Sequence, residues 1–97
     1  LAREPDDPLA LNNLGVALIH AGRNAEAIEP LERAVRVRPQ VARAHNNLGG
    51  ALSAVGKTAE AIDQFRQALR IDPNLVMAQK NLDVLLSPDA RATERAP

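Results

Sequence analysis

One segment of the chain occurs twice, 34 residues apart, and this repetition restricts the fold more than any other feature. Residues 12–18 read Asn-Asn-Leu-Gly-Val-Ala-Leu, and residues 46–52 read Asn-Asn-Leu-Gly-Gly-Ala-Leu. Aligning residues 5–38 with 39–72 gives 15 identities in 34 positions, and a degraded third copy begins at Asn81. A fixed period of this length is typical of repeat proteins, in which each unit packs against its neighbours.

Within each copy, apolar residues recur at helical spacing and turn residues separate the apolar stretches. Asp7 and Pro8 are typical of a helix start, because the acidic side chain can cap free N–H groups and proline has no N–H to leave unpaired. Gly22 and Gly56 are typical of helix ends, since glycine tolerates a left-handed backbone. The pattern predicts five helices: 8–21, 25–38, 42–55, 59–71 and 75–86.

Further local signals refine these helices. Asn24, Thr58 and Asn74 are predicted to cap the second, fourth and fifth helices. Pro30 lies inside the second helix and predicts a bend, because proline removes one backbone hydrogen bond. Asp83 stands in the fifth helix where the earlier copies have glycine, which predicts a final helix with one wet side.

The expected fold is an all-α solenoid of antiparallel helix hairpins. Gly15 and Gly49 predict places where two helices approach closely. The large apolar residues expected to fill the core are Leu14, Leu18, Leu31, Leu48, Leu52 and Phe65. The predicted domain spans residues 1–87, with 1–5 as the remnant of an upstream repeat, 8–41 and 42–75 as repeats, and 76–87 as a capping helix. Residues 88–97 lack apolar periodicity and are predicted to be a disordered tail.

Composition argues against several classes of function. Basic and acidic residues balance at 12 each, and Phe65 is the one aromatic residue, which disfavours nucleic-acid binding. There is no cysteine, and the two histidines, His20 and His45, belong to different repeats without clustered carboxylates. We therefore expect no metal, no cofactor, no catalytic residue and no membrane contact, and the chain is not expected to be an enzyme.

The repeated positions resemble the tetratricopeptide repeat (TPR). The first copy carries the resemblance through Leu11, Leu14, Gly15, Leu18, Ala27, Leu31 and Pro39, and the second through His45, Leu48, Gly49, Leu52, Ala61, Phe65 and Pro73. The resemblance implies a right-handed superhelix whose first helices line a concave groove. It also implies a non-catalytic module that binds an extended peptide or a partner helix in that groove.

The candidate groove residues lie on the first helix of each hairpin, beside the core stripe. They are Asn12, Asn13, Val16, Arg43, Asn46, Asn47, Lys80 and Asn81, with Leu9, His20, Gly50, Ser53, Met77 and Val84 on the same stripe. Asn13, Asn47 and Asn81 recur every 34 residues and are expected to form a ladder. An amide both donates and accepts, so such a ladder can hold a peptide main chain. Alternatively, these amides bond neighbouring helices or face water.

One TPR subfamily clamps the C-terminal carboxylate of chaperones with lysine, arginine and asparagine. Asn47 matches the asparagine of its second repeat, but the other clamp places hold Asn12, Val16, Met77 and Asn81, none of them a cation. Arg43 and Lys80 lie off the pattern. The sequence therefore disfavours a chaperone tail as the ligand.

Two further readings remain open. The chain could be a structural spacer that self-associates by end-to-end stacking of repeats, or the C-terminal repeat tail of a larger bacterial enzyme. Residues 1–5 align with the ends of the later helices, which predicts a fragment of a longer array. Ten of the 12 basic residues are arginine, which hints at a bacterial source. A cytoplasmic location is expected.

Overall fold

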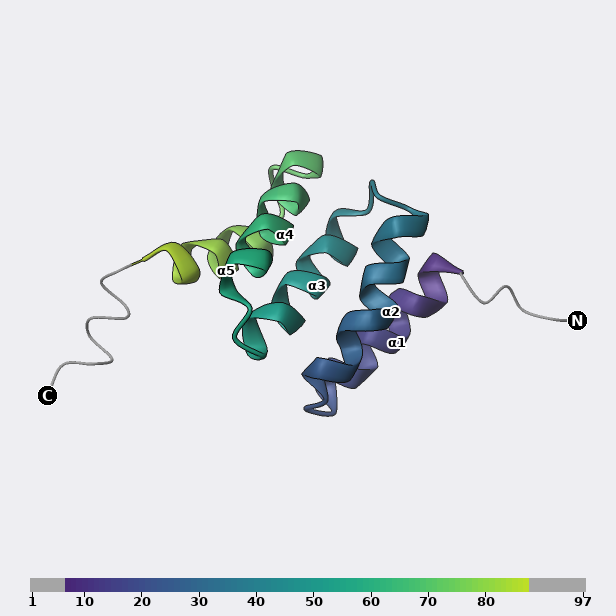
Figure 1. Cartoon of the computed structure of the whole chain (residues 1–97). Coiled ribbons are helices and arrows are strands. Elements are labelled where there is room, and N and C mark those ends of the chain that lie inside the picture. Colours follow the sequence, from purple (N-terminus) through teal and green to yellow (C-terminus); the bar gives the residue numbers. More distant parts are fainter. Residues whose placement is uncertain (1–6, 88–97) are drawn as a thin grey trace, which may run out of the picture.

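The computed structural model describes residues 7–87, which form five α-helices and no strand. The helices are α1 (Pro8–His20), α2 (Asn24–Val37), α3 (Ala42–Ala54), α4 (Thr58–Ile71) and α5 (Val76–Leu86). All five predicted helices are confirmed, each within one residue of its predicted bounds. The hairpins α1–α2 and α3–α4 stack side by side and α5 packs against α4, so α1 and α5 lie toward opposite ends of the stack (Figure 1). The predicted remnant 1–5 and tail 88–97 lie outside the described residues.

Local chemistry explains the start of α1 and the ends of α1 and α3. Asp7 caps α1, because its Oδ1 accepts a hydrogen bond from the backbone N–H of Leu9 at 3.1 Å, and Pro8 follows at the first helical position. Gly22 and Gly56 have φ angles of +78° and +88°, which residues with a Cβ rarely adopt. Both glycines end their hairpins' first helices as predicted, and the short turns after them reverse the chain.

The other three predicted caps are wrong. Asn24 and Thr58 already lie inside α2 and α4, because the preceding residues, Arg23 and Lys57, hold the non-helical cap position, and neither makes a side-chain capping hydrogen bond. The cap position before α5 belongs to Leu75 and not to Asn74, whose N–H instead donates to Asp72 Oδ1 at 3.0 Å. The tight turns therefore replace side-chain caps at these three helix starts.

The core lies within and between the hairpins, and Phe65 and Leu31 are its largest fully buried side chains. Both side chains come from second helices and pack against glycines of first helices, Phe65 against Gly49 and Leu31 against Gly15. Leu14 is 51% exposed although it was expected in the core, whereas its repeat equivalent, Leu48, is 2% exposed. Leu48 is covered because α2 packs against α3, and no described helix occupies the corresponding place before α1.

His45 replaces the aromatic residue of the family pattern and is 4% exposed. Its Nε2 lies 2.7 Å from the carbonyl oxygen of Pro39, and its Nδ1 lies 2.8 Å from Gln64 Oε1. The imidazole therefore joins the turn before α3 to α4. Pro30, also buried, lies within α2, which continues on both sides of it; the predicted bend remains a prediction.

Candidate functional site

The first helices of the repeats, α1, α3 and α5, lie side by side and form one face of the solenoid. α3 contacts α1 on one side and α5 on the other. Each of the three helices carries asparagine at repeated places, so the stacking of hairpins brings side chains 35 residues apart within hydrogen-bonding distance. This face is the candidate peptide-binding groove.

Two asparagine pairs bridge the three helices. Asn47 Nδ2 on α3 donates to Asn12 Oδ1 on α1 at 3.0 Å, and Asn81 Nδ2 on α5 donates to Asn46 Oδ1 on α3 at 3.2 Å. The bonds thus join each later amide to the residue one place before its equivalent in the preceding repeat. For Asn47 and Asn81, the structure shows the arrangement that was the alternative to ligand contact, a hydrogen bond to the neighbouring helix.

The asparagine pairs retain unused hydrogen-bonding capacity. Each amide has two N–H donors and one carbonyl acceptor with two lone pairs, and the Asn47–Asn12 bond uses one N–H of the first and one lone pair of the second. Asn12 and Asn47 are only partly buried, and Asn81 is exposed, so their remaining groups can reach a ligand. Bonding within a pair also fixes the amides in place, which lowers the entropy cost of binding.

The other predicted groove residues differ in accessibility. Asn13, Arg43 and Lys80 are exposed, and Val16 is half-buried. Asn46 is only 5% exposed, so it acts mainly as the acceptor for Asn81. The structure therefore brings four of the eight candidates into direct pairs, whereas Asn13, Val16, Arg43 and Lys80 lie outside those pairs.

A notch opens beside the second asparagine pair. This cavity of about 250 Å³ is lined by Gly50, Ser53, Ala54, Phe65, Asn81, Val84 and Leu85. A Cβ placed on Gly50 would meet no atom within 4 Å, so the absent side chain leaves open space. The repeat equivalents of Gly50 are Val16 and Val84. Sequence reasoning placed Gly50 on the groove but missed the notch, although the valine–glycine–valine series was its signal.

A larger hollow lies beside the first asparagine pair. Its volume is about 410 Å³, and Leu9 and Asn12 of α1, Arg38 at the end of α2 and Ala44 of α3 contribute to its walls. The hollow is largely apolar, with Arg38 as its cation. Sequence reasoning missed Arg38, because its place at the end of a second helix is outside the first-helix stripe. Each asparagine pair therefore borders a hollow that could accept a side chain.

An exposed ion pair lies at the turn between α1 and α2. Arg23 Nε donates to Glu26 Oε2 at 2.8 Å, and this hydrogen bond, supported by the charge attraction, lowers the pKa of Glu26 below its ordinary value of 4.5 and raises that of Arg23. Both groups are exposed and line none of the cavities described above. The pair therefore stabilises the first turn of α2 and is not part of these cavities.

Two other kinds of site, a metal centre and a membrane-spanning helix, are absent from residues 7–87. Within residues 7–87, no three His, Cys, Asp or Glu side chains gather as a group that could hold a metal ion. None of the five helices is both long and apolar enough to cross a membrane. The candidate groove therefore offers amides, small apolar hollows and exposed cations as its chemistry.

Stacked helix hairpins with a repeated 34-residue pattern define a helical-repeat protein. A family model described as tetratricopeptide repeat matches residues 6–74, and the chain belongs to this family. The structural resemblance inferred from the repeat positions is thereby confirmed, as is the all-α repeat fold. A comparison with curated proteins gave no match.

Two solved structures with a similar fold are TPR domains. The first TPR of Spaghetti (RPAP3), bound to the HSP90 peptide SRMEEVD, is 24% identical with a TM-score of 0.81, and the match covers 84% of this chain and 65% of that one. The TPR2AB domain of yeast Sti1, in complex with pHSP90, is 22% identical with a TM-score of 0.78, over 84% of this chain and 32% of that one. At these identities the likeness establishes the shared fold alone.

Proposed function

We propose that this chain is a non-catalytic protein-interaction module that binds an extended peptide across α1, α3 and α5. The observation that carries the proposal is the pair of amide bridges, Asn47 to Asn12 and Asn81 to Asn46, whose spare donors and acceptors line one face. A peptide main chain offers alternating C=O and N–H groups, which amides can satisfy whatever the peptide sequence.

The ligands of similar structures support peptide binding in general. The RPAP3 and Sti1 domains were solved with HSP90 peptide or pHSP90. In this chain the clamp places for a C-terminal carboxylate hold Asn12, Val16, Asn47, Met77 and Asn81, which supply no positive charge. We therefore propose that the groove reads an internal stretch of peptide and does not depend on a free C-terminal carboxylate.

The hollows beside the asparagine pairs would give this binding its selectivity. The notch at Gly50 has Phe65 and Leu85 among its lining residues and suits a compact aliphatic side chain. The hollow at Leu9 is also largely apolar but carries Arg38. A peptide held at both asparagine pairs would place side chains over both hollows, so the preferred motif has two apolar anchors.

A peptide array followed by isothermal titration calorimetry tests the proposal. Gly50→Leu should lower affinity for the selected peptides by about tenfold or more, because the new side chain fills the notch that an anchor would occupy. The substitution removes no hydrogen bond, and space for its Cβ is open. Ala25→Leu, on the exposed surface of α2 and lining none of the described cavities, is the matched control and should bind like the parent chain.

Asn47→Ala provides a second, independent arm, because it removes one amide and leaves the notch unchanged. It should weaken every selected peptide to a similar extent, since the amide would contact main chain and not side chains. Circular dichroism checks that each variant keeps its helices. Absence of any array binding, or full affinity in both Gly50→Leu and Asn47→Ala, would contradict groove binding.

Self-association is a second candidate, and one observation favours it. Leu9 and Leu14 on α1 are 67% and 51% exposed, and large apolar side chains left exposed can mark an interface. Sedimentation velocity over a wide concentration range should then show a dimer that Leu14→Lys dissociates. A constant monomer mass would remove this candidate and leave the groove proposal untouched.

A further inference from the structure

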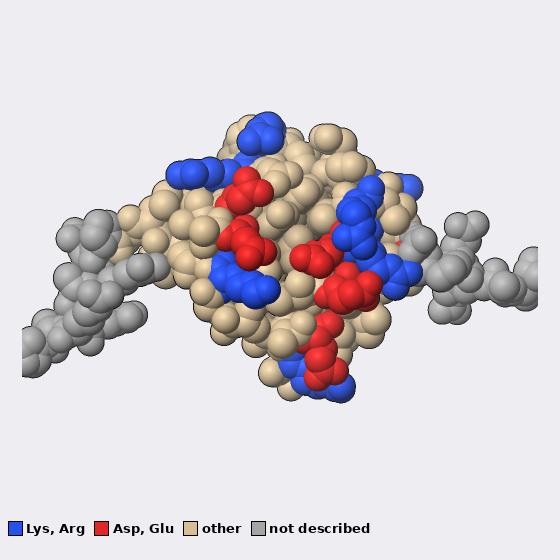
Figure 2. Space-filling model, viewed as in Figure 1, with Lys and Arg blue, Asp and Glu red and all other residues tan. Residues whose placement is uncertain are grey.

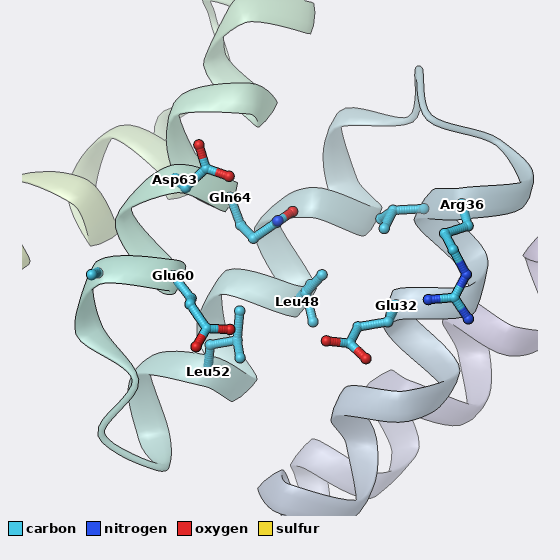
Figure 3. A pocket seen from close by; sticks show the side chains of 9 residues that line it. Glu32, Arg36, Leu48, Leu52, Glu60, Asp63 and Gln64 are labelled. Carbon is cyan, nitrogen blue, oxygen red and sulfur yellow. The ribbon is translucent and has the colours of Figure 1, made fainter.

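A cavity opens on the face formed by the second helices, away from the asparagine pairs. Its volume is about 500 Å³, and α2, α3 and α4 all contribute to it. Leu48 and Leu52 of α3 form an apolar floor with Val35 of α2. Figure 3 shows Glu32 and Glu60, from the two flanking helices, extending toward the space above these leucines.

Comparison of the two repeats shows that the charges here are unusual. In the first repeat, the first two acidic residues of the second helix, Glu26 and Glu29, both have cationic partners. Arg23 Nε lies 2.8 Å from Glu26 Oε2, and Arg33 Nε lies 3.6 Å from Glu29 Oε2. These carboxylates are therefore neutralised within their own helix and its turn.

The equivalent carboxylates of the second repeat, Glu60 and Asp63, border the cavity and lack such partners. Gln67 stands where the first repeat has an arginine, and it gives Asp63 a neutral hydrogen bond of 2.8 Å. Lys57 replaces the other arginine, and no ion pair to Glu60 or Asp63 occurs among residues 7–87. The second repeat thus has both acidic residues at the rim of the cavity but lacks the ion pairs that neutralise their equivalents in the first repeat.

A third carboxylate faces them from the opposite side. Glu32 of α2 aligns with Arg66 of the second repeat, so its negative charge is not part of the repeated pattern. Acidic side chains lie on both sides of a hollow surface between α2 and α4 (Figure 2). The charged residues that line the cavity are three carboxylates, Glu32, Glu60 and Asp63, and one cation, Arg36. A positively charged ligand would relieve the repulsion between facing carboxylates.

We propose that this cavity binds an arginine or lysine side chain from a basic segment of a partner protein. Such side chains combine an aliphatic stem with a charged end. The stem would lie over Leu48 and Leu52, and the cation would lie between Glu32 and Glu60, where charge-assisted hydrogen bonds form. The site is independent of the groove on the first helices, so the chain would have two interaction faces.

Nuclear magnetic resonance titration of the whole chain tests this site. The probe is a blocked peptide of alternating leucine and arginine, and the comparison peptide has citrulline in place of arginine, which keeps nearly the same shape without the charge. The arginine peptide should shift the methyl signals of Leu48 and Leu52 and the side-chain amide of Gln64. The citrulline peptide should bind at least about fivefold more weakly, and added salt should weaken the arginine peptide.

Matched variants connect this binding to the unpaired acids. Glu60→Gln/Asp63→Asn should lower affinity for the arginine peptide about fivefold or more, whereas the equivalent change in the first repeat, Glu26→Gln/Glu29→Gln, should leave it unchanged. Gln67→Arg restores the residue type of the first repeat and should also weaken binding, by supplying an internal cation to Asp63.

Several outcomes would overturn the proposal. The first is equal affinity of the arginine and citrulline peptides for the parent chain, or equal affinity of the arginine peptide for Glu60→Gln/Asp63→Asn and Glu26→Gln/Glu29→Gln. The second is a shift pattern confined to the side-chain amides of Asn47 and Asn81, which would assign the peptide to the groove. The third is a concentration-dependent mass that Glu60→Gln/Asp63→Asn abolishes, which would make the occupant a second copy of this chain.

Discussion

Gly49 and Gly50 are adjacent in α3, and the structure predicts opposite effects when each is replaced by alanine. An ideal Cβ on Gly49 would lie 2.7 Å from Cε1 of Phe65, which is nearer than real contacts allow. An ideal Cβ on Gly50 would meet no atom within 4 Å. Phe65 is only 1% exposed, so its ring has little room to move away. Gly49→Ala therefore forces α3 and α4 apart, and Gly50→Ala does not.

The magnitudes follow from two terms. Replacing glycine by alanine inside a helix stabilises it by about 0.5–1 kcal/mol, because alanine has less backbone freedom to lose on folding. Overpacking a tight core contact costs about 1–3 kcal/mol. Gly50→Ala should therefore raise the free energy of unfolding by about 0.5–1 kcal/mol. Since the helix term cancels between the two variants, Gly49→Ala should be less stable than Gly50→Ala by the full overpacking cost, about 1–3 kcal/mol.

Urea unfolding followed by circular dichroism measures this difference. The two hairpins and α5 share one core, so one cooperative transition is expected, with similar dependence on urea in all variants. The Gly49→Ala midpoint should lie below that of Gly50→Ala. Equal midpoints, or a more stable Gly49→Ala, would refute the close approach of α3 to Phe65 on which this reasoning depends.

Three further predictions concern single contacts. Phe65→Ala should lower the free energy of unfolding by about 3–5 kcal/mol, measured by urea unfolding, because it empties the centre of the core. Phe65→Leu should cost less, since Leu31 already fills the equivalent place of the first repeat. His45→Leu should lower stability by about 1–3 kcal/mol by the same measurement despite its apolar character, because Gln64 and the carbonyl of Pro39 lose their partner. Arg23→Gln should raise the pKa of Glu26 toward 4.5, as measured in a carboxylate titration by nuclear magnetic resonance. In the parent chain the ion pair stabilises the fold above pH 4.5, the ordinary pKa of Glu26. This contribution is lost as the pH falls through the lowered pKa and Glu26 becomes protonated.

The fold could be predicted because its determinants repeat. Gly22 alone would be weak evidence for a turn. Because glycine occurs again 34 positions later, at Gly56, the two residues together predict the same turn in each repeat. Helix ends governed by a backbone preference, such as the positive φ of these glycines, were therefore found correctly. The cap at Asp7 was also correct, but those at Asn24 and Thr58 were not, because these residue types are common both as caps and as first-turn residues, and the turn geometry decides between the two.

The candidate site could be predicted only in part. The sequence placed Asn47 and Asn81 on the correct helices, but their partners depend on how far one hairpin is displaced against the next. That displacement joins Asn47 to Asn12 and not to Asn13, an offset of 35 residues and not 34. Cavities between second helices depend on the same stacking of hairpins. The sequence of one repeat alone therefore could not predict that Glu32 and Glu60 line the same cavity.

One helix, α3, serves both proposed faces, and this has a consequence for assigning them. Asn47 belongs to the groove, whereas Leu48, the next residue, belongs to the floor of the acidic cavity, and Gly49 after it contacts Phe65. Substitutions at the Gly49 contact would shift α3 and disturb both faces together, so loss of binding in them could not identify a site. Gly50 and the carboxylates of α4 avoid this problem, because each borders one cavity and neither holds the hairpins together. Differential loss of binding in those variants can therefore assign a ligand to one face.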